Sequence, residues 1–452
     1  MRKNKLDNLI TDRLSDYDRQ KLFLQVEQNS VTYGQLNDEV VKWKNTLNAN
    51  DVKYSDFILI LGDYSLEAIS ASLAVMDYGA SFTLQTYSSY KMIEHHLDSL
   101  GVDWVIQDGA LKSRKRQCEN AIFNKNPGVC LFFSSGTTGN PKAIVHDYRK
   151  LIEKFNRNTE SYISIAFLTF DHMGGFNTLI SAIFSESTLI YTADRTPGDI
   201  CKKISIFKVT VFSTTPTFLN MLLASSLYKN YDLRSLVMIT YGTEVMNQAT
   251  LKRLTEIFPT VRFKQTYGLS EIGVLPTKSK SKTSLFFKIS ASDIKVKVVN
   301  GILHIKCPTE MLGNFIFKTA KNWEFKIQNL EWFCTDDFVE VDGDYFRILG
   351  RKTDLINVGG SKIYPVEVEE ILTNFNYIAS ALVYKAEHKL LGNVVAAKII
   401  LDEDFVDSFK SSLILKLRIM KDCRGKLPKY AVPSEVHLVE DFNVTTRFKT
   451  KR

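Results

Sequence analysis

The segment LFFSSGTTGNPKAIV, residues 131–145, contains the residue types that bind polyphosphates. Glycine lets the backbone turn so that successive N–H groups converge on an anion, hydroxyls donate further hydrogen bonds, and a lysine adds a positive charge. The segment has no Gly-Lys-Ser/Thr, so it predicts a phosphate loop of another kind than the Walker loop, and a flexible surface turn is the alternative. The candidate phosphate ligands are Ser134, Ser135, Gly136, Thr137, Thr138, Gly139 and Lys142.

Three later segments also combine groups that could bind a nucleotide. They are QTYGLSEIG (265–273), WFCTDD (332–337) and GRKTDLINVGG (350–360). A carboxylate can accept hydrogen bonds from hydroxyl groups or bind a hard cation such as Mg²⁺, and an aromatic ring offers a flat face to a base. Taken one at a time, each segment fits a packed turn with solvated charges equally well.

Alternating strands and helices are predicted to position these segments. From about residue 20 to 285, apolar runs such as DFILILG, TVFST and SLVMITYG alternate with helix-length stretches such as SLEAISASLAVM and PTFLNMLLAS. This alternation is typical of mostly parallel sheets covered by helices on both faces. From about 286 to 350, short alternating segments that include WEFKIQ and a DG turn predict an antiparallel, barrel-like subdomain.

The length and the change of pattern predict two domains. A chain of 452 residues exceeds what a single core usually supports. The predicted fold class is α/β, with a large N-terminal domain over residues 1–350 that contains the parallel sheets and the barrel-like subdomain. A small, mobile α+β domain over residues 351–452 is expected to follow.

Composition argues against several other classes of protein. The formal charge is only +8, and no basic run interleaved with aromatic residues occurs before the last few residues, so a nucleic-acid surface is not indicated. No stretch of 18 apolar residues and no export signal is present, so we expect no membrane span. The six cysteines form no CxxC pair, which favours reduced thiols and a cytoplasmic location over zinc or disulfides.

Together, the segments resemble the motifs of the adenylate-forming enzymes, which include acyl-CoA synthetases, peptide-synthetase adenylation domains and luciferases. SSGTTGNPK resembles the family's phosphate loop, QTYGLSEIG its aromatic-Gly-x-Thr/Ser-Glu motif and WFCTDD its Thr-Gly-Asp motif. GRKTDLINVGGSKIYPVEVEE (350–370) is similar to the hinge and following loop, and NVTTRFKTKR (443–452) to the catalytic lysine segment. All five occur in the family's order.

The resemblance implies a site in which ATP activates a carboxylic acid. The phosphate loop would hold the β- and γ-phosphates, Glu271 would bind Mg²⁺ and Ser270 would contact the α-phosphate. Tyr267, next to Gly268, would present its ring to the adenine. Asp337 would accept hydrogen bonds from the ribose hydroxyls.

The remaining implied roles concern catalysis and the second half-reaction. Arg351 would contact the ribose or a phosphate, and Lys449 would bridge the reacting carboxylate and phosphate oxygens. The small domain would rotate about a hinge at Thr353 to admit a thiol. Gly359 and Gly360 would then line the tunnel for a pantetheine arm, with a plain turn as the alternative. The sequence departs from the family at Asp336 and Phe448, where glycine is usual, and at Thr353.

The segment TFDHMGGFNTL, residues 169–179, permits two registers. In the first, His172 and Gly175 resemble the His-x-x-Gly of acyl-CoA synthetases, in which the histidine gates the acid pocket. In the second, Asp171 resembles the aspartate with which peptide-synthetase domains bind an amino group. The first fits better and favours an uncharged acid over an amino acid. The expected pocket walls are Met173, Phe176, Asn177, Tyr241, Gly242, Thr243 and residues near Val274.

The predicted function is that of an AMP-forming acid:thiol ligase, which uses ATP and Mg²⁺, releases pyrophosphate and transfers the acyl group to CoA. A carrier-protein phosphopantetheine is the alternative acceptor, with an amino acid among the acids to be considered. A catalytically inactive nucleotide-binding homologue is a further alternative, because a fold does not settle a function.

Overall fold

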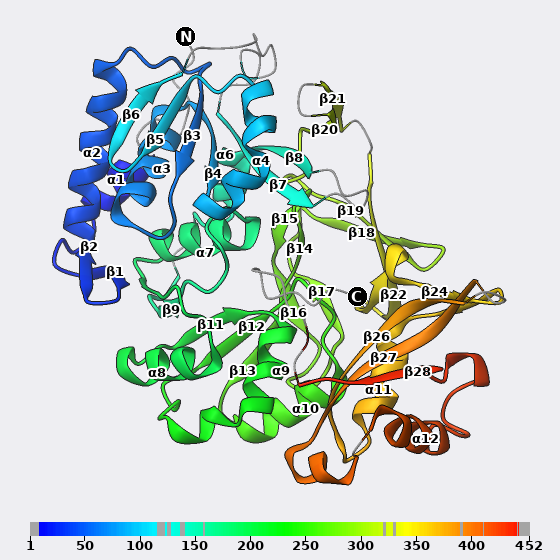
Figure 1. The fold of residues 1–452 in the computed structure, drawn as a ribbon. Coiled ribbons are helices and arrows are strands. Elements are labelled where there is room, and N and C mark those ends of the chain that lie inside the picture. The colour runs from blue at the N-terminus through cyan, green and yellow to red at the C-terminus, as the bar shows by residue number, and fades with distance from the viewer. Residues whose placement is uncertain are drawn as a thin grey trace.

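The computed structural model describes residues 9–114, 123, 128–135, 141–156, 159–319, 322–328, 331–388, 392–409, 411–440 and 442. Figure 1 shows a large domain built from sheets and covering helices, with a small domain beside it that holds most of the chain after residue 355. The predicted α/β class, with a large N-terminal and a small C-terminal domain, is confirmed.

A seven-stranded sheet contains the strands that later end at the candidate site. Its order is β13-β12-β11-β9-β10-β1-β2, and its neighbouring strands are parallel except for the β1–β2 edge. The strands are β1 (Leu22–Val26), β2 (Asn29–Thr32), β9 (Ile163–Ile165), β10 (Thr188–Tyr191), β11 (Val211–Thr214), β12 (Met238–Tyr241) and β13 (Arg262–Gln265). The crossover helices are α7 (Met173–Phe184), α8 (Pro197–Phe207), α9 (Pro216–Ser225) and α10 (Gln248–Ile257).

Local sequence signals begin these helices at defined residues. The Thr215 hydroxyl accepts a hydrogen bond from the N–H of Phe218, and Pro216 occupies the first turn of α9, where its missing N–H leaves no bond unmade. Thr196 and Pro197 begin α8 in the same way. Each crossover helix follows a parallel strand, so the loops that join strand to helix lie at the carboxyl edge of the sheet.

An eight-stranded sheet combines a parallel centre with antiparallel edges. Its order is β21-β20-β8-β7-β4-β3-β5-β6. The strands are β3 (Phe57–Leu61), β4 (Ser81–Gln85), β5 (Trp104–Gln107), β6 (Ala110–Ser113), β7 (Val129–Ser135), β8 (Pro141–Asp147), β20 (Gly313–Thr319) and β21 (Asn322–Ile327). Its nearby helices are α1 (Leu9–Ser15), α2 (Tyr33–Ala49), α3 (Leu66–Tyr78), α4 (Tyr87–Ser99) and α6 (Tyr148–Glu153).

One segment lies in a different sheet from the one predicted. The sequence places WEFKIQ in the antiparallel subdomain, but β20 pairs with β8 and so joins this segment to the large sheet. Phe315 and Phe317 of β20 are buried there, against the apolar side chains of β7 and β8. Local alternation cannot reveal this, because a strand looks the same in sequence whichever sheet it joins.

The antiparallel subdomain is a six-stranded sheet in the order β16-β17-β23-β22-β19-β18. Its strands are β16 (Thr277–Ser279), β17 (Phe287–Ile289), β18 (Lys295–Val299), β19 (Ile302–Lys306), β22 (Phe333–Asp342) and β23 (Tyr345–Arg351). A short hairpin of β14 (Tyr267–Leu269) and β15 (Gly273–Leu275) precedes it. The hairpin and the subdomain share one apolar core.

The small domain has its own sheet and its own core. The strands are β24 (Ile356–Val358), β25 (Ser361–Ile363), β26 (Ile378–His388), β27 (Gly392–Leu401) and β28 (Glu435–Leu438), and the helices are α11 (Pro365–Thr373) and α12 (Ser412–Asp422). It contacts the large domain through α11, where Arg347 of β23 pairs with Glu370 at 3.4 Å and the Thr373 hydroxyl lies 3.2 Å from Asn247 Oδ1.

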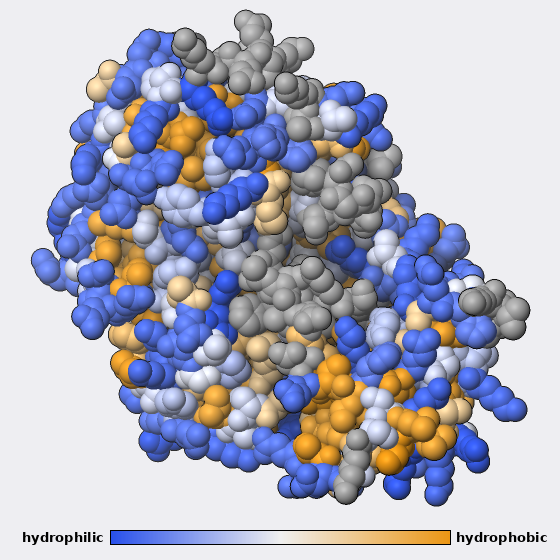
Figure 2. All heavy atoms as spheres, in the orientation of Figure 1, coloured by the Kyte–Doolittle hydropathy of each residue, from blue (hydrophilic) through white to orange (hydrophobic). Residues whose placement is uncertain are grey.

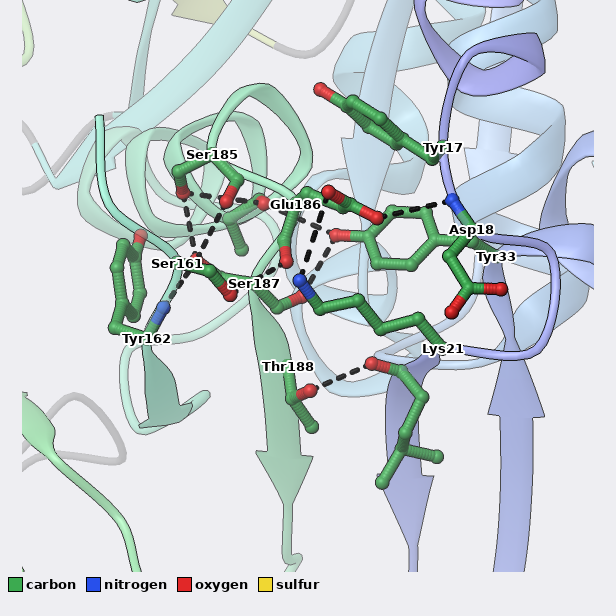
Figure 3. A network of polar contacts seen from close by, with 12 residues as sticks. Tyr17, Asp18, Lys21, Tyr33, Ser161, Tyr162, Ser185, Glu186, Ser187 and Thr188 are labelled. Atoms are coloured by element: carbon green, nitrogen blue, oxygen red, sulfur yellow. Dashed lines mark hydrogen bonds and ion pairs between the residues drawn. The ribbon is translucent and has the colours of Figure 1, made fainter. Parts of the chain in front are cut away.

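A polar network ties the start of the chain to the loop before β10 (Figure 3). The Tyr33 hydroxyl donates to the carbonyls of Ser187, at 2.8 Å, and Ala182, at 3.2 Å. The Thr188 hydroxyl donates to the Leu22 carbonyl at 2.6 Å, and Lys21 pairs with Glu186 at 3.7 Å. These bonds satisfy polar groups at the point where β1 inserts beside β10.

The surface in Figure 2 is mainly hydrophilic, with hydrophobic residues gathered over the small domain. Helix α12 exposes Leu413, Ile414 and Leu417. No helix within the described ranges has both the length and the apolar character needed to cross a bilayer.

Candidate active site

Three parallel strands end side by side at the candidate site. The last residues of β11, β12 and β13 are in register, at Thr214, Tyr241 and Gln265. Directly after β12, a Cβ on Gly242 would lie only 2.3 Å from Thr266 Oγ1, so the close approach of these two loops requires glycine. The carboxyl edge of a parallel sheet is where α/β folds bind ligands.

A cavity of about 680 Å³ opens at this edge, between the sheet and the small domain. Five of the predicted nucleotide residues line it: Thr243, Tyr267, Gly268, Asp337 and Arg351. The proposed hinge residue Thr353 lines it as well. Residues that sequence reasoning did not single out include Thr217, Glu244, Asn247, Gln265, Glu369 and Thr373.

Asp337 and Glu369 are buried carboxylates that line the cavity, and Asp337 is the one paired with the predicted nucleotide residues. Its Oδ2 accepts a 2.6 Å hydrogen bond from the Tyr267 hydroxyl, and its Oδ1 lies 3.3 Å from Arg351 Nε. Burial raises the pKa of Asp337, while the charge of Arg351 and the Tyr267 hydroxyl oppose that rise. Since a carboxylate has about four lone-pair positions, Asp337 can still accept bonds from a ligand.

The departure at Asp336 preserves the turn that the family's glycine would form. Asp336 has a φ of 57°, in the left-handed region that glycine adopts freely and that aspartate tolerates better than most residues. Its neighbour Asp337 is thereby aimed inward, and the Asp337 N–H donates to the Thr335 hydroxyl at 3.1 Å. The local turn is therefore compatible with an aspartate at this position.

Tyr267 plays a larger part than the sequence indicates. Its hydroxyl binds Asp337, which lies 70 positions later in the chain, and its ring packs against Phe287 with centroids 5.8 Å apart. Burial and the Asp337 charge raise the pKa of Tyr267 well above its usual value, so the hydroxyl remains a donor. At the next position, a Cβ on Gly268 would meet the Gly273 carbonyl at 2.5 Å, which requires glycine in this hairpin.

Ser270 and Glu271 lie at the turn between β14 and β15. The Ser270 carbonyl lies 2.6 Å from His146 Nε2, and the Glu271 carbonyl accepts from the N–H of Met311 at 2.8 Å. Burial lowers the pKa of His146 to about 4, so this contact is made by a neutral ring at neutral pH. The Glu271 side chain is half-buried; burial lowers the pKa of Arg351, but the carboxylates of Asp337 and Glu271 raise it.

The two arms of the predicted phosphate loop are antiparallel partners. Ser134 at the end of β7 pairs with Lys142 near the start of β8, and both side chains are half-buried. Ser135 belongs to β7 by its backbone. Four of the predicted loop residues, Gly136, Thr137, Thr138 and Gly139, lie outside the described residues, as does the candidate catalytic Lys449.

His172 begins helix α7 as its N-cap. Its Nδ1 accepts a hydrogen bond from the N–H of Gly174 at 3.3 Å, which directs the ring to the helix start. Gly175 is required, because a Cβ there would lie 1.9 Å from the Thr169 carbonyl oxygen. Asp171 is buried, while His172 is half-buried, so the histidine is the more accessible of the two.

Gly359 and Gly360 form the tip of the β24–β25 hairpin. Both have positive φ, 55° and 92°, and the Gly360 N–H donates to Asn357 Oδ1 at 3.0 Å. No atom lies within 4 Å of a Cβ built at either position, so crowding does not require glycine here. The turn conformation with its positive φ does. They do not line the cavity; their predicted role at a tunnel remains a prediction.

Gln265 is a candidate ligand that the sequence reasoning missed. It is buried and lines the cavity, yet its Oε1 has no hydrogen-bond partner among the described residues. A buried acceptor without a partner is costly unless a ligand satisfies it. The exocyclic amine of a nucleotide base could donate to this acceptor. The sequence signal for Gln265 was its position two residues before Tyr267, in the same segment.

The family signature of AMP-binding enzymes matches residues 13–301, and that of their C-terminal domain matches residues 367–449. The chain belongs to the AMP-binding enzyme family. Curated members are similar over most of their length. The 2-succinylbenzoate–CoA ligase of Bacillus subtilis is 26% identical over 80% of this chain and 75% of its own. That of Bacillus cereus is 24% identical over 92% and 91%.

Solved members of the AMP-binding enzyme family share the fold. The anthranilate CoA ligase AuaEII in complex with anthranoyl-AMP superposes with a TM-score of 0.77 at 19% identity, over 98% of this chain and 95% of its own. The o-succinylbenzoate CoA synthetase of Bacillus subtilis with its acyl-adenylate intermediate has a TM-score of 0.72 at 21% identity, over 98% and 96%. At these identities the likeness is one of fold.

Proposed function

We propose that this AMP-binding enzyme converts a carboxylic acid to an acyl-adenylate with ATP and then transfers the acyl group to the thiol of CoA. The observation that carries the proposal is the cavity at the carboxyl edge of the sheet, where Tyr267 and Arg351 hold the buried carboxylate of Asp337. The acyl-CoA ligases among its relatives support the same activity.

The residues of the cavity fit a nucleoside. Asp337 offers an ionised acceptor to the two ribose hydroxyls, and Gln265 Oε1 offers an unpaired buried acceptor to the adenine amine. Gly242 and Gly268 permit close approach of backbone to backbone, which keeps the walls of the base pocket narrow. Lys142 and Ser134 would extend the site toward the phosphates.

In the adenylation step, the protein mainly neutralises the negative charge of the phosphates and forms no covalent bond with the substrate. A carboxylate oxygen of the acid attacks the α-phosphorus, the bond to the bridging oxygen breaks, and pyrophosphate leaves with the electron pair. Lys142, Arg351 and Lys449 are the cations that would offset the developing charge. Glu271 would help to hold Mg²⁺, which usually binds one or two carboxylates together with phosphates and would supply positive charge beside the triphosphate.

The acceptor thiol would attack the acyl carbonyl after the small domain turns. Thr353 lies at the cavity where the domains join, so a rotation of residues 351–452 would reshape the site. The described cysteines are free, which suits the reducing cytoplasm. His172, at the start of α7, would stand at the entrance for the acid.

The test is pyrophosphate release from ATP and Mg²⁺ with a panel of carboxylic acids, followed by thioester formation with CoA or with a phosphopantetheinylated carrier protein. We expect acid-dependent pyrophosphate release and a thioester with CoA. A thioester with the carrier alone would reassign the acceptor. ATP binding without acid-dependent turnover would identify an inactive homologue and contradict the proposal.

A further inference from the structure

Lys154, directly after helix α6, has its ammonium group in an unusual environment. Its Nζ donates to Asn177 Oδ1 and to the Val274 carbonyl, both at 2.7 Å, and lies 4.8 Å from the centroid of the Phe155 ring. All of these partners are neutral. No carboxylate among the described residues forms an ion pair with Lys154, and of its three donor positions only two are used.

The surroundings make a charge at this place costly. Burial lowers the pKa of Lys154 to about 7, with Cys307 the only other group that shifts it. Buried lysines ordinarily pair with a carboxylate. A lysine with a strongly perturbed pKa and no anionic partner is a candidate functional group. A purely structural clamp between α6, α7 and β15 would be served as well by an uncharged donor.

Lys154 is not fully enclosed by the core. Lys154, Asn177 and Val274 are each half-buried, whereas the flanking Leu151 and Ile152 are buried. In helix α7 every residue is buried except Asn177 and Ser181, which are one turn apart and so form one accessible stripe. The Lys154 site, formed by Lys154, Asn177 and Val274, therefore lies between the more accessible side of α7 and the β14–β15 hairpin.

The Lys154 site lies beside a strand that lines the nucleotide cavity. Val274 is the direct antiparallel partner of Gly268, which lines the cavity, and α7 begins at His172. An acid whose carboxyl group reaches the α-phosphate near Ser270 would extend its other end along the same hairpin. The ammonium of Lys154 would then meet the far end of that acid.

We propose that Lys154 selects the acid, and that the substrate is a carboxylic acid with a second anionic group, such as a second carboxylate, which completes the ion pair that the protein leaves open. The inference rests on the proposed ligase function and names its substrate class. It revises the expectation of an uncharged acid, and it disfavours an amino acid, because the ammonium of Lys154 would repel a second ammonium group.

The test compares acids matched in size. Pyrophosphate release is measured with adipate, its monomethyl ester and hexanoate, and with isophthalate, its monomethyl ester and benzoate. For the wild type, we expect kcat/KM for at least one diacid to exceed that of its ester by about tenfold or more, the range of a desolvated charge pair. Lys154→Met should abolish this preference, and Lys154→Arg should retain part of it.

A matched control is Lys150→Met, which removes an exposed lysine of the same helix and should leave both activities and the preference unchanged. Equal use of diacids and esters by the wild type would overturn the inference while leaving the ligase function intact. So would a Lys154→Met variant that loses activity equally with all acids, the result expected of a clamp. Acid-independent behaviour throughout would overturn the ligase function, and this inference with it.

Discussion

The nucleotide cavity and the Lys154 site differ in whether the protein itself supplies an opposite charge to the buried ionisable group. Asp337 is buried, but its negative charge is paired with Arg351 and accepts a hydrogen bond from the Tyr267 hydroxyl. Among the residues that the structure describes, Lys154 Nζ contacts a side-chain amide, a carbonyl and an aromatic ring, and no carboxylate. A charge paired within the protein stays ionised and keeps a ligand-binding geometry ready, whereas a charge left unpaired gains its partner when the ligand arrives.

The largest effect that would test this comparison is the loss of the paired carboxylate. Asp337→Ala removes the acceptor for the ribose and leaves Arg351 and Tyr267 without their partner, so kcat/KM for ATP should fall about 100-fold. Pyrophosphate release measures it. Asp342→Ala, at the exposed end of the same strand, should leave kcat/KM unchanged. Similar activity in both variants would remove Asp337 from the site.

A smaller effect separates the pairing from the carboxylate itself. Tyr267→Phe keeps the ring and deletes the hydroxyl that donates to Asp337, so kcat/KM for ATP should fall about tenfold, as for the loss of one hydrogen bond to a charged group. A calorimetric titration with ATP should show weaker binding by a similar factor. Unchanged binding would mean that Arg351 alone keeps the carboxylate in place.

The unpaired charge should be visible in the pH dependence of acid use. With Lys154 at a pKa of about 7, raising the pH through this value neutralises the ammonium in the free enzyme, so kcat/KM for the preferred diacid should fall. The facing groups His146, with a pKa near 4, and Cys307, whose pKa is raised by burial, do not titrate there. Lys154→Met should show no such fall, and a fall shared by both proteins would exclude Lys154 as its source.

A further prediction concerns stability. The folded pKa of Lys154, about 7, lies below the unfolded value of roughly 10.4, so the unfolded chain binds more protons between these two limits. The free energy of unfolding should therefore rise with pH from about 7 to about 10 in the wild type, relative to Lys154→Met. Urea titrations at several pH values measure the difference, and parallel curves would refute the low pKa.

Much of the fold could be predicted because its signals are local. The strands β3, β11 and β12 and the helix α9 lie within the predicted segments, and most of α3 does, since apolar periodicity and flanking proline or threonine act within a few residues. The assignment of β20 and β21 failed because the choice of sheet depends on Phe315 and Phe317 finding a partner surface more than 150 residues earlier.

The sequence by itself determined the chemistry on offer: a phosphate-binding loop, a tyrosine–glycine pair before an acidic turn, and an aspartate before the last strands of the large domain. Only the tertiary structure decided that Tyr267 donates to Asp337 and that, within the described part of the chain, Gln265 Oε1 has no hydrogen-bond donor and Lys154 has no anionic partner. The physical reason is that burial and pairing arise between segments far apart in the chain. These contacts, more than residue type, decide whether a charge is paired within the protein or left to pair with a ligand.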